Sequence, residues 1–421
     1  MTRRRNWAGN YEYRATDLRS PKSVDELQEL VAGTSHIRAL GSRHCFNDIA
    51  DTDGVQVSLA ELPRRIDIDA AASTVTVDGG ITYGQLAPVL QDNGWALSNL
   101  ASLPHISVAG ACATATHGSG TRNQNLAAAV AGMDLVTASG EIRSVRRGDQ
   151  DFDGLPVGLG AAGIASAITL DIVPTYDVFT EVFTGLPWVT LVERLDDITA
   201  AGYSVSVLPN WRPDGQAKAF VKQRVAESTP GRTDFFGAVP ANTPLHLIDG
   251  MDAGGCTPQL GEAGPWYQRL PHFKLDFTPS AGEELQSEYL VPLTNGRQAL
   301  QAIKSHAAEL AGLALATEVR TVAADQLWLS SAYRRDCLAI HFTWVQDQPA
   351  VTALLARLEA SLADLEARPH WGKLFTTSAS RIRQLYPRLG DFADLSRRLD
   401  PNGTFSNDFT RRHLADVTQA G

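Results

Sequence analysis

The sequence predicts an α+β fold in two domains, and three observations carry this prediction. Up to Pro174, short stretches alternate apolar and polar residues with period two, and only a few helical patterns interrupt them. This arrangement is typical of an α+β domain and not of a steady alternation of strands and helices. After Pro174, longer helical patterns alternate with strands, so we expect a domain boundary near residue 175. The length of 421 residues also agrees with two domains.

The first predicted element is a helix over residues 23–33. Ser23 and Glu26 have the spacing of a capping box, apolar residues then recur with helical period, and Gly33 follows the last of them. The apolar stretch HIRAL at residues 36–40 predicts a strand that stops at a Gly-Ser turn.

Alternating patterns predict most of the remaining elements. Thr82 is placed as the N-cap of a helix that ends before Gly94, although Pro88 lies inside it. In the first half we expect strands over residues 54–62, 64–69, 73–80 and 164–174, and a hairpin over residues 133–145. In the second half we expect helices over residues 294–313 and 348–367, and strands over residues 317–321 and 337–345.

Composition argues against several classes of protein. The net charge of −10 argues against a nucleic-acid partner, because phosphate binding needs a basic face. The basic start MTRRRNW is followed by polar residues, so we expect no signal peptide, and no apolar run has the length of a membrane span. The four cysteines lie far apart without a CxxC pair, so we expect no metal site, no disulfides and a reduced, cytoplasmic protein.

The stretch GLGAAG at residues 158–163 matches the dinucleotide-binding pattern G-x-G-x-x-G, and Glu181 lies where a ribose-binding acid would follow. That motif needs a strand before it and a helix after it. Here a polar, turn-like stretch precedes it, and a β-branched, alternating stretch follows it. The sequence therefore does not favour a nicotinamide-dependent dehydrogenase.

Two other stretches, residues 39–48 and 99–125, are rich in small residues. The first, ALGSRHCFND, places a histidine and a cysteine directly after the Gly-Ser turn. The second contains THGSG, whose consecutive backbone N–H groups can bind an anion. The first stretch alone is consistent with a metal site, a nucleophile, a cofactor anchor or no function, and the second alone is equally consistent with a tightly packed loop. Two such segments in one strand-rich domain suit the pyrophosphate of a dinucleotide better than packing alone.

These stretches resemble a known family of flavoproteins. LGSRHCFND, NLASLPHISVAG, THGSG and GIASAITLDIVP look like the FAD-binding domain of the vanillyl-alcohol oxidase superfamily. Later stretches are similar to alditol oxidases, close kin of the aldonolactone oxidases: FTPSAGEELQSEYLVP, ATEVRTVAAD, HFTWV, RPHWGKLF and LDPNGTFSNDF. The resemblance implies an FAD-binding domain at 1–174 and a substrate-binding cap domain at 175–375, built on an antiparallel sheet with flanking helices. A C-terminal segment at 376–421 would return to the FAD domain.

The resemblance also implies how FAD is bound. His44, after the Gly-Ser turn, would be bonded covalently to the 8α-methyl of the flavin. Doubly anchored relatives carry a cysteine where this sequence has Leu103, so we expect one covalent link, with Cys45 a neighbour of the anchor and Cys112 uninvolved. The expected cofactor contacts are Ala39, Leu40, Gly41, Ser42, Arg43, His44, Cys45, Ser102, Ser107, Gly110, Thr114, Ala115, Thr116, His117, Ile164 and Lys373.

A polyol site is implied in the second half. The expected substrate contacts are Ser102, Gln286, Glu318, Arg320, Thr343 and Lys373. The residue pattern agrees, because Glu318 and Arg320 share one face of a strand, as do His341 and Thr343. That face alone is equally consistent with a solvated surface, but Lys373 lies between aromatic residues, which suits solvent poorly. The implied catalytic residues are the cations Arg320 and Lys373, with His341 as a candidate proton acceptor.

The implied reaction is oxidation of the terminal hydroxyl of alditols such as xylitol and sorbitol to the aldose, with dioxygen reduced to hydrogen peroxide. Two alternatives remain: an aldonolactone oxidase or dehydrogenase of the same superfamily, and a flavin-binding protein without turnover. Ala101, at the position thought to gate oxygen, occurs in oxidases and dehydrogenases alike. The polyol and dioxygen are the expected partners, and we expect a monomer that binds neither nucleic acid nor membrane.

Overall fold

The described part of the chain, residues 4–212, 215–277 and 283–414, has an α+β architecture in this computed structural model. Its larger sheets are a three-stranded parallel sheet, a five-stranded antiparallel sheet and a nine-stranded antiparallel sheet. The predicted fold class is therefore confirmed. Part of the stretch at 277–292 (residues 278–282), the first three residues and the last seven of the predicted C-terminal segment (415–421) lie outside the described residues.

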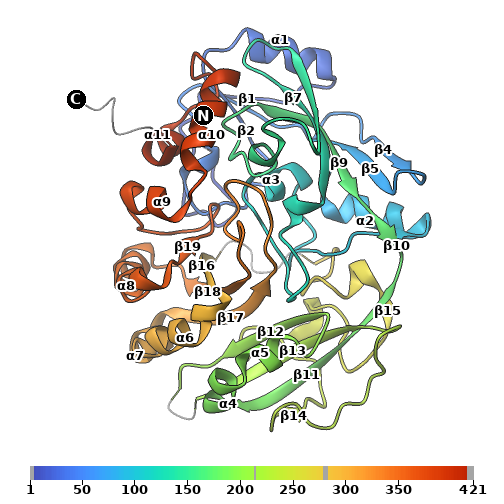
Figure 1. Ribbon diagram of the computed structural model, residues 1–421, viewed down its shortest axis with the longest axis vertical. Coiled ribbons are helices and arrows are strands. Elements are labelled where there is room, and N and C mark those ends of the chain that lie inside the picture. The colour runs from blue at the N-terminus through green and yellow to red at the C-terminus, as the bar shows by residue number, and fades with distance from the viewer. Residues whose placement is uncertain (1–3, 213–214, 278–282, 415–421) are drawn as a thin grey trace.

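The first half of the chain forms the two smaller of these sheets, in the upper part of Figure 1. The parallel sheet has the strand order β1-β3-β2, and the antiparallel sheet has the order β4-β5-β9-β7-β8. The elements are β1 (Asp17–Arg19), α1 (Val24–Ala32), β2 (Ile37–Ala39), η1 (Asp48–Ala50), β3 (Val55–Val57), β4 (Ile66–Asp69), β5 (Thr74–Asp78), α2 (Tyr83–Asp92), β6 (Trp95–Ala96), α3 (Val108–Ala113), η2 (Leu126–Ala129), β7 (Val130–Val136), β8 (Ile142–Arg146), η3 (Phe152–Gly154), β9 (Ile164–Asp171) and β10 (Val173–Pro174).

Local signals explain where the first helices begin. Thr82 and Gln85 form a complete capping box at the start of α2, which extends through Pro88 as expected. At α1 only half of the predicted capping box forms: Ser23 Oγ accepts from the backbone N–H of Glu26. The Glu26 carboxylate accepts instead from the backbone N–H of Lys22, at 2.7 Å.

The second half of the chain forms the large sheet, in the order β14-β11-β13-β12-β17-β18-β16-β19, with β15 beside β11. β10 pairs with β6 of the first half, so the expected boundary near residue 175 falls between strands of different sheets. The division into domains stays a prediction. The elements are β11 (Asp177–Pro187), α4 (Trp188–Glu193), α5 (Leu195–Thr199), β12 (Ser204–Pro209), β13 (Gln216–Arg224), β14 (Val239–Pro240), η4 (Ala253–Gly255), β15 (Gly264–Pro265), η5 (Trp266–Gln268), β16 (Glu284–Pro292), η6 (Leu293–Asn295), α6 (Gly296–Lys304), α7 (Ala307–Leu313), β17 (Ala314–Val322), β18 (Cys337–Val345), α8 (Gln348–Ser361), η7 (Ala363–Leu365) and β19 (Arg368–Pro369).

The predicted single helix over residues 294–313 is wrong, because the chain forms two helices there, α6 and α7. The break lies at Ser305 and His306. The Ser305 hydroxyl donates to the carbonyl of Ala302, a local bond that competes with the regular helix pattern. The predicted strand over 54–62 is also shorter than expected, since β3 ends at Val57.

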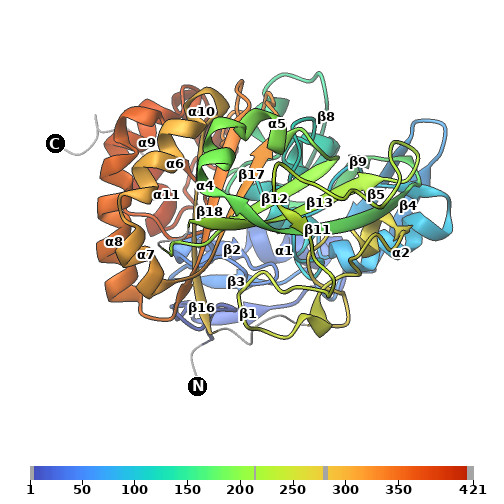
Figure 2. The same cartoon turned by 90° about the horizontal axis from the view of Figure 1, so that it is seen from below.

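The two faces of the large sheet differ in character. Figure 2 shows α6, α7 and α8 side by side along β16, β17 and β18. Val319, Ile340 and Phe342 pack toward these helices in one apolar core. Because side chains alternate across a strand, the intervening residues of the same strands face the other way, toward the first half of the chain. One part of that second face is polar, with Glu288, Glu318 and His341, and Leu290, Val322 and Ala339 form a small apolar cluster at its end.

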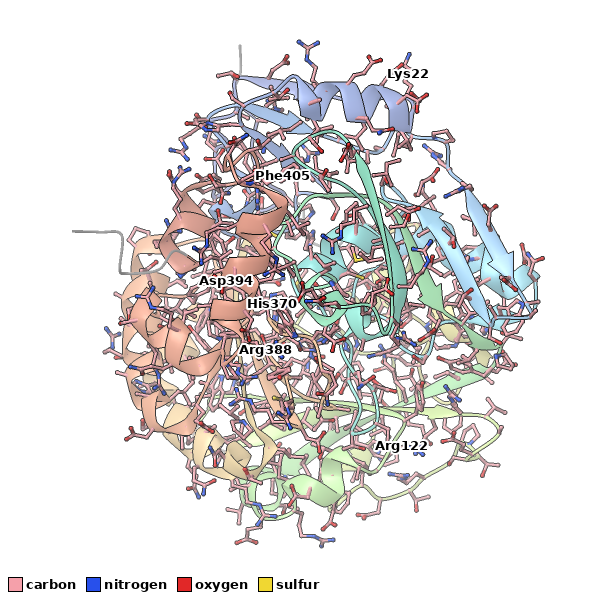
Figure 3. The ribbon with its side chains drawn as sticks, turned by 45° about the horizontal axis from the view of Figure 1, so that its top comes forward. Lys22, Arg122, His370, Arg388, Asp394 and Phe405 are labelled. Atoms are coloured by element: carbon pink, nitrogen blue, oxygen red, sulfur yellow. The ribbon has the colours of Figure 1, made fainter. Side chains whose placement is uncertain are left out.

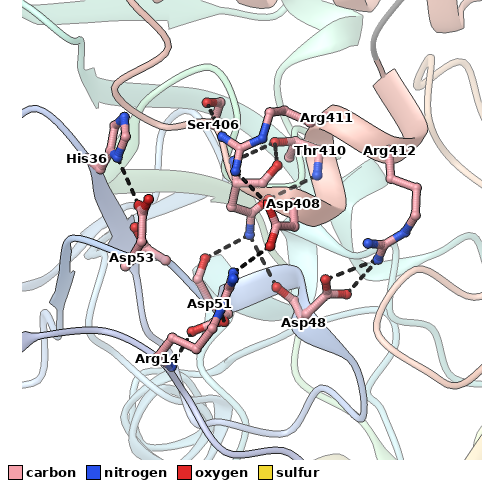
Figure 4. Close-up of polar contacts among 12 residues, drawn as sticks. Arg14, His36, Asp48, Asp51, Asp53, Ser406, Asp408, Thr410, Arg411 and Arg412 are labelled. Atoms are coloured by element: carbon pink, nitrogen blue, oxygen red, sulfur yellow. Dashed lines mark hydrogen bonds and ion pairs between the residues drawn. The ribbon is translucent and has the colours of Figure 1, made fainter.

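The C-terminal helices α9 (Ala379–Leu385), α10 (Leu389–Leu399) and α11 (Asp408–Leu414) return to the first half. Phe392 and Phe409 belong to the same apolar core as Val157 of the first half. Polar contacts reinforce the junction (Figure 4): Arg14 pairs with Asp51 and with Asp408 of α11, each at 2.7 Å. In the described residues, no helix combines the length and apolar character that a membrane crossing requires.

Candidate active site

A cavity of about 440 Å³ lies where the polar face of the large sheet meets the first half of the chain. The predicted site residues that line it are Ala39, Leu40, Gly41, Ser42, Arg43, His44, Cys45, Ser102, Ser107, Gly110, Thr114, Thr116, His117, Ile164, Gln286, Glu318, Arg320, His341, Thr343 and Lys373. Ala115 is buried behind the lining, with a left-handed φ of 55°. The fold therefore brings the two predicted sets of residues to one cavity.

The cofactor end of the cavity has the features of a backbone cradle. A Cβ on Gly41 would come within 2.6 Å of Ser107 Oγ, and one on Gly110 within 2.7 Å, so both glycines allow a close backbone approach. Ser107 Oγ is buried and has no hydrogen-bond partner in the protein. A buried hydroxyl of this kind normally has a partner. The cradle therefore fits a ligand with polar oxygens, such as the pyrophosphate of FAD.

His44 lies in the same cavity with its ring against Trp7, at 4.4 Å between ring centroids. Its Nε2 is buried without a hydrogen-bond partner in the protein. Burial, and then the charge of Lys373, lowers the pKa of His44 to about 4, so the imidazole is neutral at pH 7. A neutral ring with an unpaired nitrogen fits the expected attachment point of the flavin.

The loop that carries His44 is tied to the segment that carries Lys373. The backbone N–H of Phe46 donates to the carbonyl of Gly372 at 2.8 Å. Asn47 Nδ2 donates to the carbonyls of Trp371 and Lys373, both at 2.8 Å. The predicted anchor and the predicted catalytic cation are thus held at a fixed relative position.

The misleading motif at residues 158–163 also lines the cavity, but not as a dinucleotide-binding turn. β9 begins directly after it, at Ile164, so no helix follows the glycines, as expected. Instead, the buried Arg38 guanidinium donates to the carbonyls of Leu159 and Gly160, at 2.7 and 2.9 Å. Glu181 lies on β11 and accepts from backbone N–H groups of the second half.

Glu288 is a site residue that the sequence pattern had not singled out. Its side chain is 1% exposed and accepts from Arg320 Nη2 at 2.6 Å and from Lys373 Nζ at 2.7 Å. His117 Nε2, from the first half, lies 3.2 Å away. A signal was present, because Glu288 follows Gln286 by two residues in β16 and therefore shares its face.

The buried charges of the site balance one another. Burial alone raises the pKa of Glu288, but Lys373 and Arg320 outweigh it and hold that pKa well below its usual range. Glu318 behaves likewise, with Arg320 as the main opposing charge. Burial lowers the pKa of Lys373, and Glu288 opposes this effect. Two carboxylates and two cations thus share one low-dielectric site.

His341 sits between Lys373 and Thr343. Its Nδ1 lies 2.6 Å from Lys373 Nζ and its Nε2 lies 3.2 Å from Thr343 Oγ1. Burial, and then the charge of Lys373, lowers the pKa of His341 to about 4. Nδ1 also lies 3.7 Å from Glu288 Oε2, so this nitrogen has both a donor and an acceptor beside it. The role of His341 as proton acceptor stays a prediction.

Strand register explains how the remaining side chains meet. Glu318 of β17 and Glu288 of β16 flank His341 of β18, and Gln286 lies opposite Thr343. Ser102 comes from the first half, and its Oγ lies 3.5 Å from Arg320 Nη1. The cavity therefore has hydroxyl-binding groups on both sides.

His370 is a further cavity residue that the sequence analysis had not anticipated. Figure 3 shows it in the interior, near the C-terminal helices. Its Nδ1 accepts from the backbone N–H of Gly372 at 3.1 Å. Burial, and then Lys373, lowers its pKa well below the usual value, so it is neutral. Within the described residues, no cluster of His, Cys, Asp or Glu is arranged to hold a metal ion.

Comparison with known proteins agrees with this site. Residues 18–146 match the family model "FAD binding domain", and residues 282–413 match "D-arabinono-1,4-lactone oxidase". An alditol oxidase from a Streptomyces species is 46% identical over 96% of this chain and 97% of its own. The chain belongs to the alditol oxidase family. This family lies within the vanillyl-alcohol oxidase flavoproteins, so the chain is an FAD-dependent oxidoreductase.

More distant members of this superfamily act on lactones. An L-gulono-1,4-lactone dehydrogenase from Mycobacterium tuberculosis is 33% identical over 97% of this chain and 98% of its own.

Among solved structures, a cholesterol oxidase from B. sterolicum covers 98% of this chain and 96% of its own, with a TM-score of 0.79 and 14% identity. At that identity the likeness concerns the fold alone.

Proposed function

We propose that this alditol oxidase family member oxidises the terminal primary hydroxyl of alditols, such as xylitol and sorbitol, to the aldose. The observation that carries the proposal is the polar face of β16, β17 and β18, where Gln286, Glu318, Arg320 and Thr343 line the cavity. A buried face with so many hydrogen-bonding groups suits a ligand that carries several hydroxyls. We also propose a cytoplasmic location and a monomeric state. The four cysteines are unpaired, which a reducing compartment favours.

In this proposal the Gly41–Ser107–Gly110 cradle would hold FAD, and His44 would carry the covalent bond to it. When bound, FAD would supply the redox chemistry, which is uptake of a hydride from the terminal carbon and reduction of dioxygen to hydrogen peroxide. The unpaired Nε2 of His44 and the unpaired Oγ of Ser107 support this assignment. Leu103 lines the same cavity where a second anchor would need a cysteine.

The two cations act on the reacting hydroxyl. Arg320 and Lys373 are both hydrogen-bonded to Glu288, so they are fixed in place before substrate arrives. Positive charge at that point lowers the pKa of a neighbouring hydroxyl and stabilises negative charge that develops during oxidation. His341 orients Lys373 and Thr343 in this scheme. Glu318 accepts hydrogen bonds from the inner hydroxyls of the alditol.

The deciding experiment measures hydrogen peroxide release with xylitol, sorbitol and L-gulono-1,4-lactone as separate substrates. The proposal expects turnover with the two alditols and little with the lactone. A matched assay with an artificial electron acceptor under anaerobic conditions separates oxidase from dehydrogenase behaviour. Turnover with the lactone alone would refute the proposal.

A lactone-oxidising enzyme is the second candidate. The match of residues 282–413 to the D-arabinono-1,4-lactone oxidase model favours it, since that region contains most of the predicted substrate contacts. The higher identity to an alditol oxidase than to the lactone dehydrogenase favours the first candidate.

A further inference from the structure

His272 is a buried residue that does not line the cavity but contacts Glu318, which does. It is 6% exposed, and its Nε2 lies 2.9 Å from Glu318 Oε1. We infer that His272 is a positioning residue for substrate binding, which acts by holding the Glu318 carboxylate toward the inner hydroxyls. The inference rests on the proposed function, because it needs a hydroxyl-bearing substrate beside Glu318.

The contact fixes the direction of the hydrogen bond. Burial, and then the charge of Lys222, lowers the pKa of His272 to about 4, so the ring is neutral and carries one proton. An ionised carboxylate can only accept, so that proton must lie on Nε2. Glu318 Oε2 lies 3.6 Å from Arg320 Nε on its other side. Both carboxylate oxygens therefore have a neighbouring cation or donor before any substrate binds.

The backbone around His272 holds a second predicted substrate residue. The N–H groups of His272 and Phe273 both point to the carbonyl of Ser102, at 3.1 and 3.3 Å. Ser102 belongs to the first half of the chain and Glu318 to the large sheet. One short segment, residues 270–273, thus sets the distance between hydroxyl-binding groups on opposite sides of the cavity.

Lys222 anchors this segment from β13. Its Nζ donates to the carbonyls of Leu270 and Pro271, and the residue is buried, at 2% exposed. The backbone N–H of Thr257 donates to the carbonyl of His272 at 2.9 Å. Lys222, Thr257, Leu270 and Pro271 are not among the residues that line the cavity, so the segment is held by contacts outside it, as a positioning element needs.

A merely structural histidine would show different behaviour on substitution. His272→Gln places an amide N–H near the position of the imidazole Nε2, so it keeps the donor to Glu318. His272→Leu keeps bulk and removes the donor. If His272 only fills space, the two variants should behave alike, whereas a positioning role separates them.

The test is anaerobic flavin reduction, read against the concentration of whichever donor, xylitol or L-gulono-1,4-lactone, reduces the wild-type enzyme. His272→Leu should raise the half-saturating concentration about tenfold, as for loss of a hydrogen bond to a charged group. Its limiting rate should stay within about threefold, since the binding contact is made in ground and transition states alike. His272→Gln should recover most of the loss. His306→Leu, at the turn between α6 and α7 on the apolar side of the large sheet, is the control and should match wild type.

A double-mutant cycle with Glu318→Gln decides whether the effect passes through Glu318. In that background, His272→Leu should weaken binding by less than about twofold. Equal behaviour of the Leu and Gln variants, or full additivity in the cycle, would overturn the inference. If the Leu variant does not fold, His272→Asn replaces it, because its amide is too short to reach Glu318. If neither donor reduces the wild-type flavin, the proposed function fails and the inference falls with it.

Discussion

Lys373 and Glu288 form a 2.7 Å ion pair in which the carboxylate is 1% exposed. Glu288 also accepts from Arg320, so a single carboxylate holds both predicted catalytic cations. An unpaired charge in such a place would be strongly unfavourable. The pair joins β16 to the segment after β19, and it places the ammonium at the polar face of the large sheet.

Lys373→Met should slow the chemical step far more than it weakens binding. The substitution keeps side-chain length and removes the charge, so limiting flavin reduction by xylitol should fall about 10²–10³-fold, equivalent to roughly 3–4 kcal/mol. Stopped-flow traces at several xylitol concentrations separate the rate from the affinity. A wild-type limiting rate with only the affinity changed would make Lys373 a positioning residue.

Glu288→Gln should lower the free energy of unfolding and shift the pH dependence of flavin reduction. The variant leaves Arg320 and Lys373 with Glu318 as their remaining carboxylate. The free energy of unfolding should therefore fall by about 3–5 kcal/mol. Without Glu288, the pKa of Lys373 should fall further, because Glu288 opposes the effect of burial. The alkaline limb of flavin reduction should then move to lower pH. Thermal unfolding and a pH series measure the two effects, and an unchanged pH profile would contradict the second.

His44→Ala should lose covalent flavin. Acid precipitation should leave yellow flavin on the wild-type polypeptide and release it from the variant, while the glycine cradle retains some FAD under native conditions. Cys45→Ser and Cys112→Ser are the controls and should keep the bond, because burial raises the pKa of each thiol to about 12 and leaves it unreactive. Release of all flavin from the wild-type protein would disprove the covalent link.

Lys222 should make stability depend on pH. Burial lowers its pKa from 10.5 to about 7, although Glu318 opposes this. Between these values the unfolded chain binds a proton that the folded chain does not, so stability rises with pH there. The contribution of Lys222 to stability is therefore fully present above pH 10.5, the unfolded-state pKa, and is lost as the pH falls through about 7, the folded-state pKa. The melting temperature of wild type, relative to Lys222→Met, should therefore rise from pH 7 to pH 9.5.

The control for this comparison is Lys22→Met, which removes an exposed lysine far from the site (Figure 3). It should track wild type at every pH. A constant difference between wild type and Lys222→Met across the range would show that Lys222 does not change its protonation there.

The sequence by itself determined the features that depend on neighbouring residues. Period-two alternation predicted that Glu318 with Arg320, and His341 with Thr343, share a strand face, and the structure has them so. The sequence also predicted the glycine turn before His44 and the strand after residues 158–163. Neighbouring residues encode these features because backbone geometry and capping act over a few positions. The break between α6 and α7 was missed, since Ser305 and His306 fit a helical pattern equally well.

Only the tertiary structure decided which charges are partners. Glu288 meets Lys373 from 85 residues away and His117 from the other half of the chain. His272 reaches Glu318 across 46 residues, from a loop without any periodic pattern. Such contacts arise when two sheets close over a cavity and each buried charge must find a partner in a medium of low dielectric constant. No local pattern specifies that pairing, because each partner's identity depends on where distant strands come to lie.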